Sequence, residues 1–323
     1  MNPGLPAPPT LGDITAAAAR IVGRVRRTPL LTAGPVRTHV AASRLVLKLE
    51  NLQITGSFKA RGAGNAVALL EQAALAQPRL SGGVVTASGG NHGLAVAYAA
   101  AAAGVPATIF LPGSVPQAKR DRFAEWGATT HIHGQVWDDA WAAAAAHAAQ
   151  TGQTLLHPFA DPAVIAGQGT VGLEIMDDLP DVDTILVAIG GGGLMAGVAL
   201  AAHARRPGVR LIGVEPTGAA TLHNSLAAGR PVVLDRIDTA AGTLAPRATD
   251  ALNFGIIQTH VDRIVLVTDT DMRDAARWLW SEHGIGTELA GAAAVAAVLT
   301  GAYCPAPGEV VCAIVCGTGT DGF

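Results

Sequence analysis

TILVAIGGGGLMAGVALAAHA, residues 184–204, is the longest apolar stretch of the chain and carries four consecutive glycines at its centre. A stretch of this length could cross a membrane as a helix. Glycine is unfavourable in a helix interior, however, so four in a row argue against one continuous helix. The stretch is better interpreted as a buried strand, a tight glycine loop and a buried helix, and we expect no membrane segment.

Composition limits the kind of protein. The chain has 323 residues, of which 50% are hydrophobic and only 4% aromatic, and its net charge is −3 at pH 7. It is long enough for two domains with cores of Ala, Val, Leu and Ile. This charge offers no basic surface to nucleic acid or anionic lipid. With no signal-peptide pattern at the N-terminus, we expect a cytoplasmic protein that binds a small molecule.

The cysteines and histidines give no metal pattern. Cys304, Cys312 and Cys316 cannot all pair with one another, and their spacing matches no zinc site. His131 and His133 alternate in THIHG with no other ligand nearby, so we interpret them as surface histidines. We expect no metal.

Short β-rich runs alternate with Ala-rich segments of helical length. Strands are expected at 45–49, 83–87, 107–111, 129–133, 184–190, 209–215, 263–267 and 309–315, and helices at 91–103, 137–150, 162–177 and 269–282. The alternation predicts an α/β fold of mostly parallel, twisted sheets flanked by helices. Ligands then bind beyond the carboxyl ends of strands. Four unusual loops lie at such positions: ITGSFK, ASGGNHG, AIGGGGLMAG and VCGTGTDG.

The loop AIGGGGLMAG (188–197) connects a strand to a helix, where backbone N–H groups and the helix N-terminus favour a phosphate. Gly191, Gly193 and Ala196 also match the dinucleotide fingerprint G-x-G-x-x-G/A, and Glu215 ends the next strand, where a ribose-binding acid is expected. A nicotinamide-dependent oxidoreductase is therefore one reading of this loop. A purely structural turn is another.

Lys59 is one of three lysines, with Lys48 and Lys119, in a chain that has 22 lysines and arginines together. An ammonium group loses its proton when desolvated, whereas a guanidinium does not, so a retained lysine suggests a nucleophilic or Schiff-base amine. A solvated helix lysine is the alternative.

ASGGNHG (87–93) adds a second candidate loop, whose N–H groups and Asn91 suit a carboxylate. In this loop, His92 is either a base or a packing residue.

Taken together, TGSFKARGA, TASGGNHG, HPFADPAVIAGQGTVGLEI and GGGGLMAGVA resemble the serine/threonine dehydratases. This family, which includes threonine ammonia-lyase and serine racemase, belongs to the pyridoxal phosphate (PLP) enzymes of fold type II. The resemblance implies a two-domain, tryptophan synthase β-like fold and a homodimer. Residues 1–51 and 154–323 would form the large PLP-binding domain, and 52–153 the small domain with the substrate-carboxylate loop.

The resemblance also implies residue roles. Lys59 would bind pyridoxal 5′-phosphate as a Schiff base and later exchange the substrate α-proton, and Phe58 would pack beside the ring. The phosphate would be held by the backbone amides of Gly190, Gly191, Gly192, Gly193 and Leu194. Asn91 would bond the cofactor 3′-oxygen, and the loop with Ser88, Asn91 and His92 would bind the substrate carboxylate.

Three positions depart from the family pattern. Cys316 stands where a serine usually meets the pyridine nitrogen, and a thiol is a weaker donor. In TAAGTLAPRA (239–248), Gly242 or Thr243 replaces an Asp, with Arg247 nearby, which leaves the preferred side chain of the substrate open. Thr221 replaces the second acid of a cation site that would use Glu215, so we expect no bound cation.

The function implied is α,β-elimination from an L-β-hydroxy amino acid such as threonine or serine, giving a 2-oxo acid and ammonia. A dehydratase for bulkier hydroxy amino acids, a racemase and a β-replacement synthase are alternatives on the same scaffold. Racemases of this family carry a second serine as the acid on the face opposite the lysine, where this chain has Gly89, so we expect little racemisation. No room follows Phe323 for a regulatory domain, which implies an unregulated catabolic enzyme.

Overall fold

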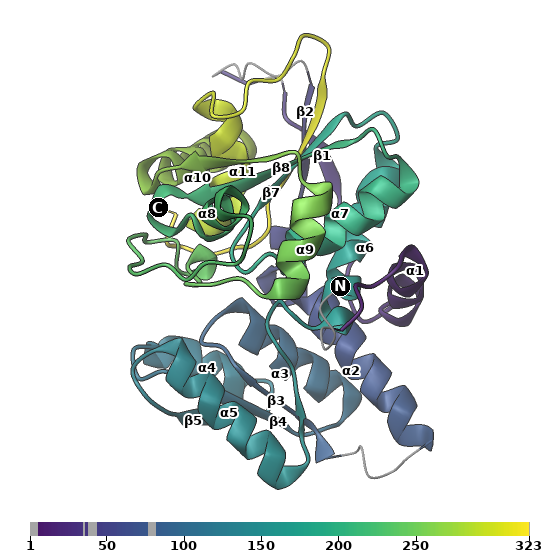
Figure 1. Cartoon of the computed structure of the whole chain (residues 1–323), viewed down its shortest axis with the longest axis vertical. Helices are drawn as coiled ribbons and strands as arrows, with labels where there is room; N and C mark the ends of the chain where they lie inside the picture. The colour runs from purple at the N-terminus through teal and green to yellow at the C-terminus, as the bar shows by residue number, and fades with distance from the viewer. Residues whose placement is uncertain (1–5, 35, 38–43, 77–81, 323) are drawn as a thin grey trace.

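The structure, a computed structural model, describes residues 6–34, 36–37, 44–76 and 82–322. Two sheets occupy two lobes (Figure 1), the smaller one accompanied by α3, α4 and α5 and the larger one by α6 to α11. In the described residues no helix is long and apolar enough to span a membrane.

The larger sheet has six strands in the order β1-β2-β10-β7-β8-β9. Only β1 is antiparallel to its neighbour, and the other pairs are parallel. The strands are β1 (Leu30–Thr32), β2 (Arg44–Lys48), β7 (Thr184–Ala188), β8 (Arg210–Pro216), β9 (Arg263–Val267) and β10 (Val310–Ile314).

The smaller sheet has four parallel strands in the order β5-β4-β3-β6. They are β3 (Val84–Ala87), β4 (Ala107–Leu111), β5 (Thr129–Ile132) and β6 (Thr154–Leu155). We keep the domain division, 1–51 with 154–323 and 52–153, as a proposal based on sheet membership. The short strand β6 extends the smaller sheet just beyond that limit.

Helices cover both sheets. They are α1 (Leu11–Arg20), α2 (Lys59–Ala76), α3 (Asn91–Ala103), α4 (Gln117–Ala124), α5 (Trp137–Thr151), α6 (Pro162–Asp178), α7 (Gly193–Arg205), α8 (Thr221–Ala228), α9 (Ala251–His260), α10 (Asp269–His283) and α11 (Leu289–Leu299).

The sequence accounts for these elements locally. Every residue of β7 is buried, as expected for a continuous apolar run inside a parallel sheet covered on both faces. The helix α11, LAGAAAVAAVL, is buried from Leu289 to Val298, because it is apolar all round and lies inside the larger lobe. Asp161 caps α6 with Pro162 in its first turn, and Thr268 caps α10.

The strands and helices named from the sequence are all present, with ends shifted by two residues at most. The prediction of an α/β fold with largely parallel sheets is confirmed. Two strands were missed: β1, with three residues, and β6, with two, are too short to show a pattern of alternation.

Close packing of α6 and α7 places the glycine loop. Gly169 of α6 and Gly197 of α7 lie against each other, so that a Cβ on Gly197 would meet the Gly169 nitrogen at 2.5 Å. The two helices therefore approach backbone to backbone, which only glycine permits. This contact fixes where α7 begins, at the last of the four glycines.

Candidate active site

A short backbone pairing brings two of the four loops together. Ser57 forms an antiparallel bridge with Gly317, and the Phe58 N–H donates to the Cys316 carbonyl at 3.2 Å. The loop before α2 thus lies along the loop after β10. This pairing places Lys59, the first residue of α2, at the carboxyl edge of the larger sheet.

Lys59 is partly exposed as a residue, but protein atoms surround its amine. Its Nζ donates to the Pro158 carbonyl at 2.6 Å and lies 5.2 Å from the centre of the Phe58 ring. Burial lowers the pKa of Lys59 to about 8, while the negative charge of Glu288 acts in the opposite direction. A useful fraction of the amine is therefore neutral near physiological pH, as a nucleophile requires.

A buried ion cluster holds the helix that carries Lys59. The Arg61 guanidinium, in the first turn of α2, donates two hydrogen bonds of 2.7 Å to Glu50 and bonds of 2.7 and 2.8 Å to Glu174. Lys48 completes the cluster by donating to Glu174 at 2.6 Å. Because β2, α2 and α6 all contribute, the cluster fixes the start of α2 relative to the larger sheet.

The four glycines form a cradle at the N-terminus of α7. Gly192 has φ +93°, which favours glycine, and a Cβ on Gly193 would meet the Phe159 carbonyl at 2.7 Å. A Cβ on Gly191 would overlap the Phe159 ring. No described residue accepts a hydrogen bond from the backbone N–H groups of residues 190–195, whereas Ile189 and Ala196 on either side both donate. Several free N–H groups at a helix N-terminus are the donors that a phosphate needs.

Thr243 lies near both the loop from β3 into α3 and the glycine loop: its methyl group is 3.9 Å from the position of a Cβ on Gly90, and its carbonyl oxygen is 3.0 Å from that of a Cβ on Gly190. Ser88 accepts a hydrogen bond from the Gly90 N–H at 3.3 Å. The N–H groups of Gly89, Asn91 and His92 donate to no described residue, so this turn is open to a carboxylate. The His92 side chain is buried, and burial together with the Lys59 charge lowers its pKa well below 6.5. Its ring is therefore neutral and supplies no cation to an anionic substrate.

Glu288 is a site residue that the sequence interpretation missed. It is 8% exposed and precedes α11, and its Oε1 accepts hydrogen bonds from Asn91 Nδ2 at 2.8 Å and Thr243 Oγ1 at 3.4 Å. Burial raises the pKa of Glu288 to about 7, with the Asp321 charge acting in the same direction. The available signal was an acid directly before an apolar helix, which by itself names no function.

The loop that departs from the family pattern, residues 239–248, borders the site through Thr243 and its neighbours. Thr243 contacts Glu288, and its methyl group lies 3.9 Å from the position that a Cβ on Gly90 would take. Arg247 is exposed and donates to the Leu234 carbonyl at 2.9 Å. Thr243 therefore borders the site near Glu288, and Leu244 and Pro246 lie against Gly190, whereas Arg247 points to Leu234.

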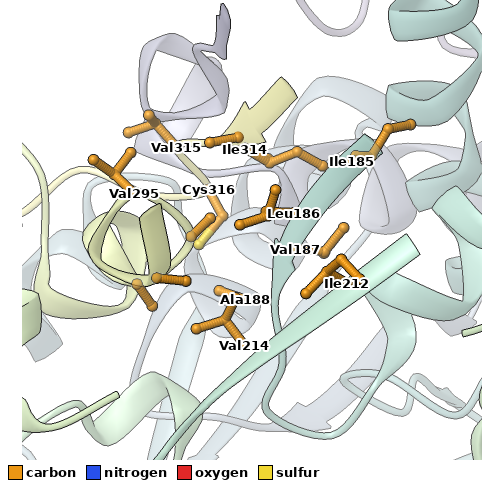
Figure 2. Packing of buried hydrophobic residues seen from close by; sticks show 14 of the residues in the cluster. Ile185, Leu186, Val187, Ala188, Ile212, Val214, Val295, Ile314, Val315 and Cys316 are labelled. Carbon is orange, nitrogen blue, oxygen red and sulfur yellow. The ribbon is translucent and has the colours of Figure 1, made fainter. Parts of the chain in front are cut away.

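Cys316 lies just beyond β10, where Figure 2 shows it beside Val315, with Val295 of α11 nearby. Its thiol is 3% exposed and donates to the Ala290 carbonyl at 3.4 Å. Burial raises the pKa of this thiol above its ordinary value, so it stays protonated. The group is uncharged at all physiological pH values.

Glu215 has a structural task. It is fully buried, and its two oxygens accept hydrogen bonds from the N–H groups of Leu222 at 2.9 Å and His223 at 2.8 Å, which caps α8. It is therefore not presented to a ribose, and the dinucleotide reading of the glycine loop loses its acidic partner. Among the described residues, no group of three or more His, Cys, Asp or Glu side chains is placed to hold a metal ion.

A buried amine next to a phosphate cradle, at the carboxyl edge of a parallel sheet, defines a protein built for a phosphorylated carbonyl cofactor. Residues 21–317 match the family described as pyridoxal-phosphate dependent enzyme, and the chain belongs to this family. Its cofactor is pyridoxal 5′-phosphate, and the orphan N–H groups of the cradle fit the phosphate.

Three relatives illustrate the similarity. The L-threonine ammonia-lyase of Thermotoga maritima is 41% identical over 290 residues, which cover 90% of this chain and 71% of that protein. The L-threonine ammonia-lyase of Geobacter sulfurreducens is 40% identical over 305 residues, 93% of this chain and 73% of that one. The solved structure of maize serine racemase is 33% identical, with a TM-score of 0.91 over 98% of this chain and 95% of that one. The match to fold type II enzymes agrees with the resemblance drawn from the motifs.

The lowered pKa of Lys59 predicts how fast the protein captures its cofactor. Only the neutral amine attacks the carbonyl, so the capture rate of cofactor-free protein should rise with pH through about 8 and then level off. Glu288→Gln should move this midpoint to lower pH, because the variant removes a negative charge that favours the ammonium form. Stopped-flow absorbance in the visible range measures both midpoints.

The control for this experiment is Glu125→Gln, which removes one exposed carboxylate remote in sequence from the site. It should leave the midpoint unchanged. If Glu288→Gln also leaves the midpoint unchanged, Glu288 does not act on the Lys59 amine.

Proposed function

We propose that the chain catalyses α,β-elimination from an L-β-hydroxy amino acid, with threonine or serine as substrate, to give a 2-oxo acid and ammonia. One observation carries the proposal: a lysine amine with a pKa near 8 is bound to the carbonyl of Pro158, whose neighbour Phe159 packs on the glycine loop, and its charge acts on His92 in the open turn. The two L-threonine ammonia-lyases that are 40% and 41% identical support it.

The residues take the following parts in this proposal. Bound pyridoxal 5′-phosphate withdraws electrons from the α-carbon of the amino acid. Lys59 binds the cofactor and then holds the α-proton at Nζ, and Phe58 packs beside the ring. The phosphate is held by the N–H groups of the glycine loop, at Gly190, Gly191, Gly192, Gly193 and Leu194. The substrate carboxylate is held by the turn at Ser88, Asn91 and His92, to which His92 contributes its backbone N–H.

The hydrogen bond to Glu288 fixes the orientation of the Asn91 side-chain amide. An amide nitrogen has two hydrogens, and the 2.8 Å bond to Glu288 uses one of them. The second is left for the cofactor 3′-oxygen, as proposed for Asn91. Cys316 would face the pyridine nitrogen of the cofactor. Its thiol is uncharged, so no anion is present at that position to hold a proton on the ring.

The lack of a side chain at Gly89 favours elimination over racemisation. Racemisation needs an acid on the cofactor face opposite Lys59, and placement is much of what general acid catalysis requires. Gly89 has no side chain, and a Cβ there would overlap the Val115 side chain. No acid can therefore be added at this position without displacing Val115.

We expect L-serine to give pyruvate and ammonia with little D-serine. Chiral chromatography of timed incubations, together with a pyruvate assay, measures both products. D-serine that accumulates faster than pyruvate would overturn the proposal and favour the racemase alternative. The double variant Gly89→Ser/Val115→Ala, which makes room for a hydroxyl, should raise the D-serine fraction above that of the wild type.

The same assay tests substrate choice. L-threonine, L-serine and bulkier β-hydroxy amino acids are compared by 2-oxo acid release, and added thiols test for β-replacement. Turnover of L-threonine or L-serine supports the proposal. If 2-oxo acid is released only from bulkier substrates, the protein is instead a dehydratase for bulkier β-hydroxy amino acids. No 2-oxo acid from any of them would refute elimination.

We further propose that the enzyme is a cytoplasmic homodimer. All three cysteines are free, and Cys304 is exposed, which suits a reducing compartment. Val22 is 78% and Leu52 46% exposed, and such apolar side chains favour an interface between copies. Light scattering should give twice the 32.6 kDa mass of one chain, and a single-chain mass would contradict the dimer.

A further inference from the structure

Asn253 reaches the phosphate cradle from a segment that none of the sequence motifs includes. It lies in the first turn of α9 and is fully buried. Its amide nitrogen donates to the Gly191 carbonyl at 2.8 Å and to the Phe159 carbonyl at 2.9 Å. One side chain therefore joins the glycine loop to the segment that lies against it.

The two acceptors fix the orientation of the Asn253 amide. Both neighbours are carbonyl oxygens, so only the NH₂ group can face them, and the opposite orientation would set three oxygens against one another. The Oδ1 atom then has no hydrogen-bond partner among the described residues. A buried, unpaired oxygen is unfavourable for stability, so the contact with the cradle is not explained by stability alone.

Thr249 acts on the same carbonyl. Its Oγ1 donates to the Gly191 oxygen at 3.2 Å, which therefore accepts two side-chain hydrogen bonds. In a trans peptide the C=O and the following N–H point in opposite directions. Holding the Gly191 oxygen toward α9 turns the Gly192 N–H away from α9, to the side where the N–H groups of the loop have no partner.

Hydrogen bonding to the Gly191 carbonyl also makes the Gly192 N–H a stronger donor. Bonds in a chain polarise one another, so a carbonyl that accepts two bonds makes the N–H of its own peptide a better donor. The bond to Phe159 adds a mechanical restraint, because Phe159 lies against Gly191 and Gly193. The glycine loop, flexible by composition, is thus held from outside by α9.

We propose that Asn253, assisted by Thr249, is a positioning residue that sets the Gly191–Gly192 peptide so that its N–H faces the cofactor phosphate. The inference rests on pyridoxal 5′-phosphate as the cofactor and goes beyond the proposed reaction, since it concerns affinity for the phosphate group whatever the substrate. Asn253 has no part in capture of the carbonyl, which belongs to Lys59.

The test compares two cofactors that differ only in the phosphate. Dissociation constants of pyridoxal 5′-phosphate and of pyridoxal are measured by visible absorbance for wild type and Asn253→Ala. Losing one well-oriented charged hydrogen bond costs about tenfold to hundredfold in affinity, and we expect a loss of that size for the phosphate form. Pyridoxal, which does not use the cradle, should bind within about threefold of wild type.

Asn65→Ala is the matched control. Asn65 is also fully buried and donates to a backbone carbonyl, that of Ala163 at 2.8 Å, but it joins α2 to α6. It should leave the ratio of the two dissociation constants unchanged. Thr249→Val, which is similar in shape, removes one of the two bonds to Gly191 and should give a smaller loss for the phosphate form only.

The outcomes are separable. An unchanged affinity of Asn253→Ala for pyridoxal 5′-phosphate, or an equal loss for both cofactors, overturns the positioning role. If Asn253→Ala is too unstable to measure, Thr249→Val decides by the same ratio. Failure of the wild type to bind either cofactor would instead refute the cofactor assignment. A lack of 2-oxo acid production would refute only the proposed reaction, and not the role of Asn253.

Discussion

Lys59→Ala should lose the visible absorbance of lysine-bound cofactor and at least about a thousandfold of turnover, while remaining folded. The other two lysines are placed differently. Lys48 is buried in the ion cluster with Glu174 at 2.6 Å, and Lys119 is an exposed residue of α4. Absorbance spectra, 2-oxo acid release and circular dichroism measure the three parts of this prediction.

Lys59→Arg separates the charge from the chemistry. A guanidinium keeps the positive charge but does not lose its proton to become a nucleophile, so this variant should be as inactive as Lys59→Ala. Normal turnover of Lys59→Arg would show that the residue acts only through its charge.

Arg61→Met should have the largest effect on stability. The variant leaves the buried carboxylates of Glu50 and Glu174 without their main partner, and breaking a buried ion pair costs about 3–5 kcal/mol of unfolding free energy. Because Arg61 is in the first turn of α2, the cofactor that we propose to be bound to Lys59 should also be lost more readily. Urea unfolding of the cofactor-free proteins, followed by fluorescence, measures the difference.

Arg24→Met is the control for this prediction. Arg24 pairs with Glu71 at 2.7 Å, but both side chains are partly exposed, 36% and 29%, and such pairs contribute about 1 kcal/mol or less. Should Arg61→Met unfold within about 1 kcal/mol of the Arg24→Met variant, the cluster is not what holds α2.

Much of the fold follows from local patterns in the sequence. The strand at 184–188 is fully buried and the helices at 91–103 and 162–178 are continuous, so their apolar runs are read directly, as are Gly90 and Gly104 at the ends of the first helix. The order of strands in each sheet is not local. It depends on pairings such as β10 with both β2 and β7, whose partners lie far apart along the chain.

The residues of the candidate site also form two groups: those that local motifs predict and those that only the fold brings together. Lys59 and the glycine loop lie in contiguous motifs, where several residues together require one chemistry, and the sequence predicts them. Glu288 and Asn253 each lie at the start of a helix and contact a loop that is remote in sequence. Only the folded chain brings Glu288 to Asn91 and Asn253 to the cradle, so no sequence pattern marks them.

The cofactor-bearing lysine is the central claim, and trapping it is the most direct measurement. Borohydride reduction of the purified protein fixes the cofactor to its lysine, and peptide mass spectrometry then locates it among Lys48, Lys59 and Lys119, the only lysines of the chain. We predict the added mass on the peptide that contains Lys59 alone, with loss of the visible band. Label on Lys48 or Lys119, or no label in a protein that binds pyridoxal 5′-phosphate, would contradict the account.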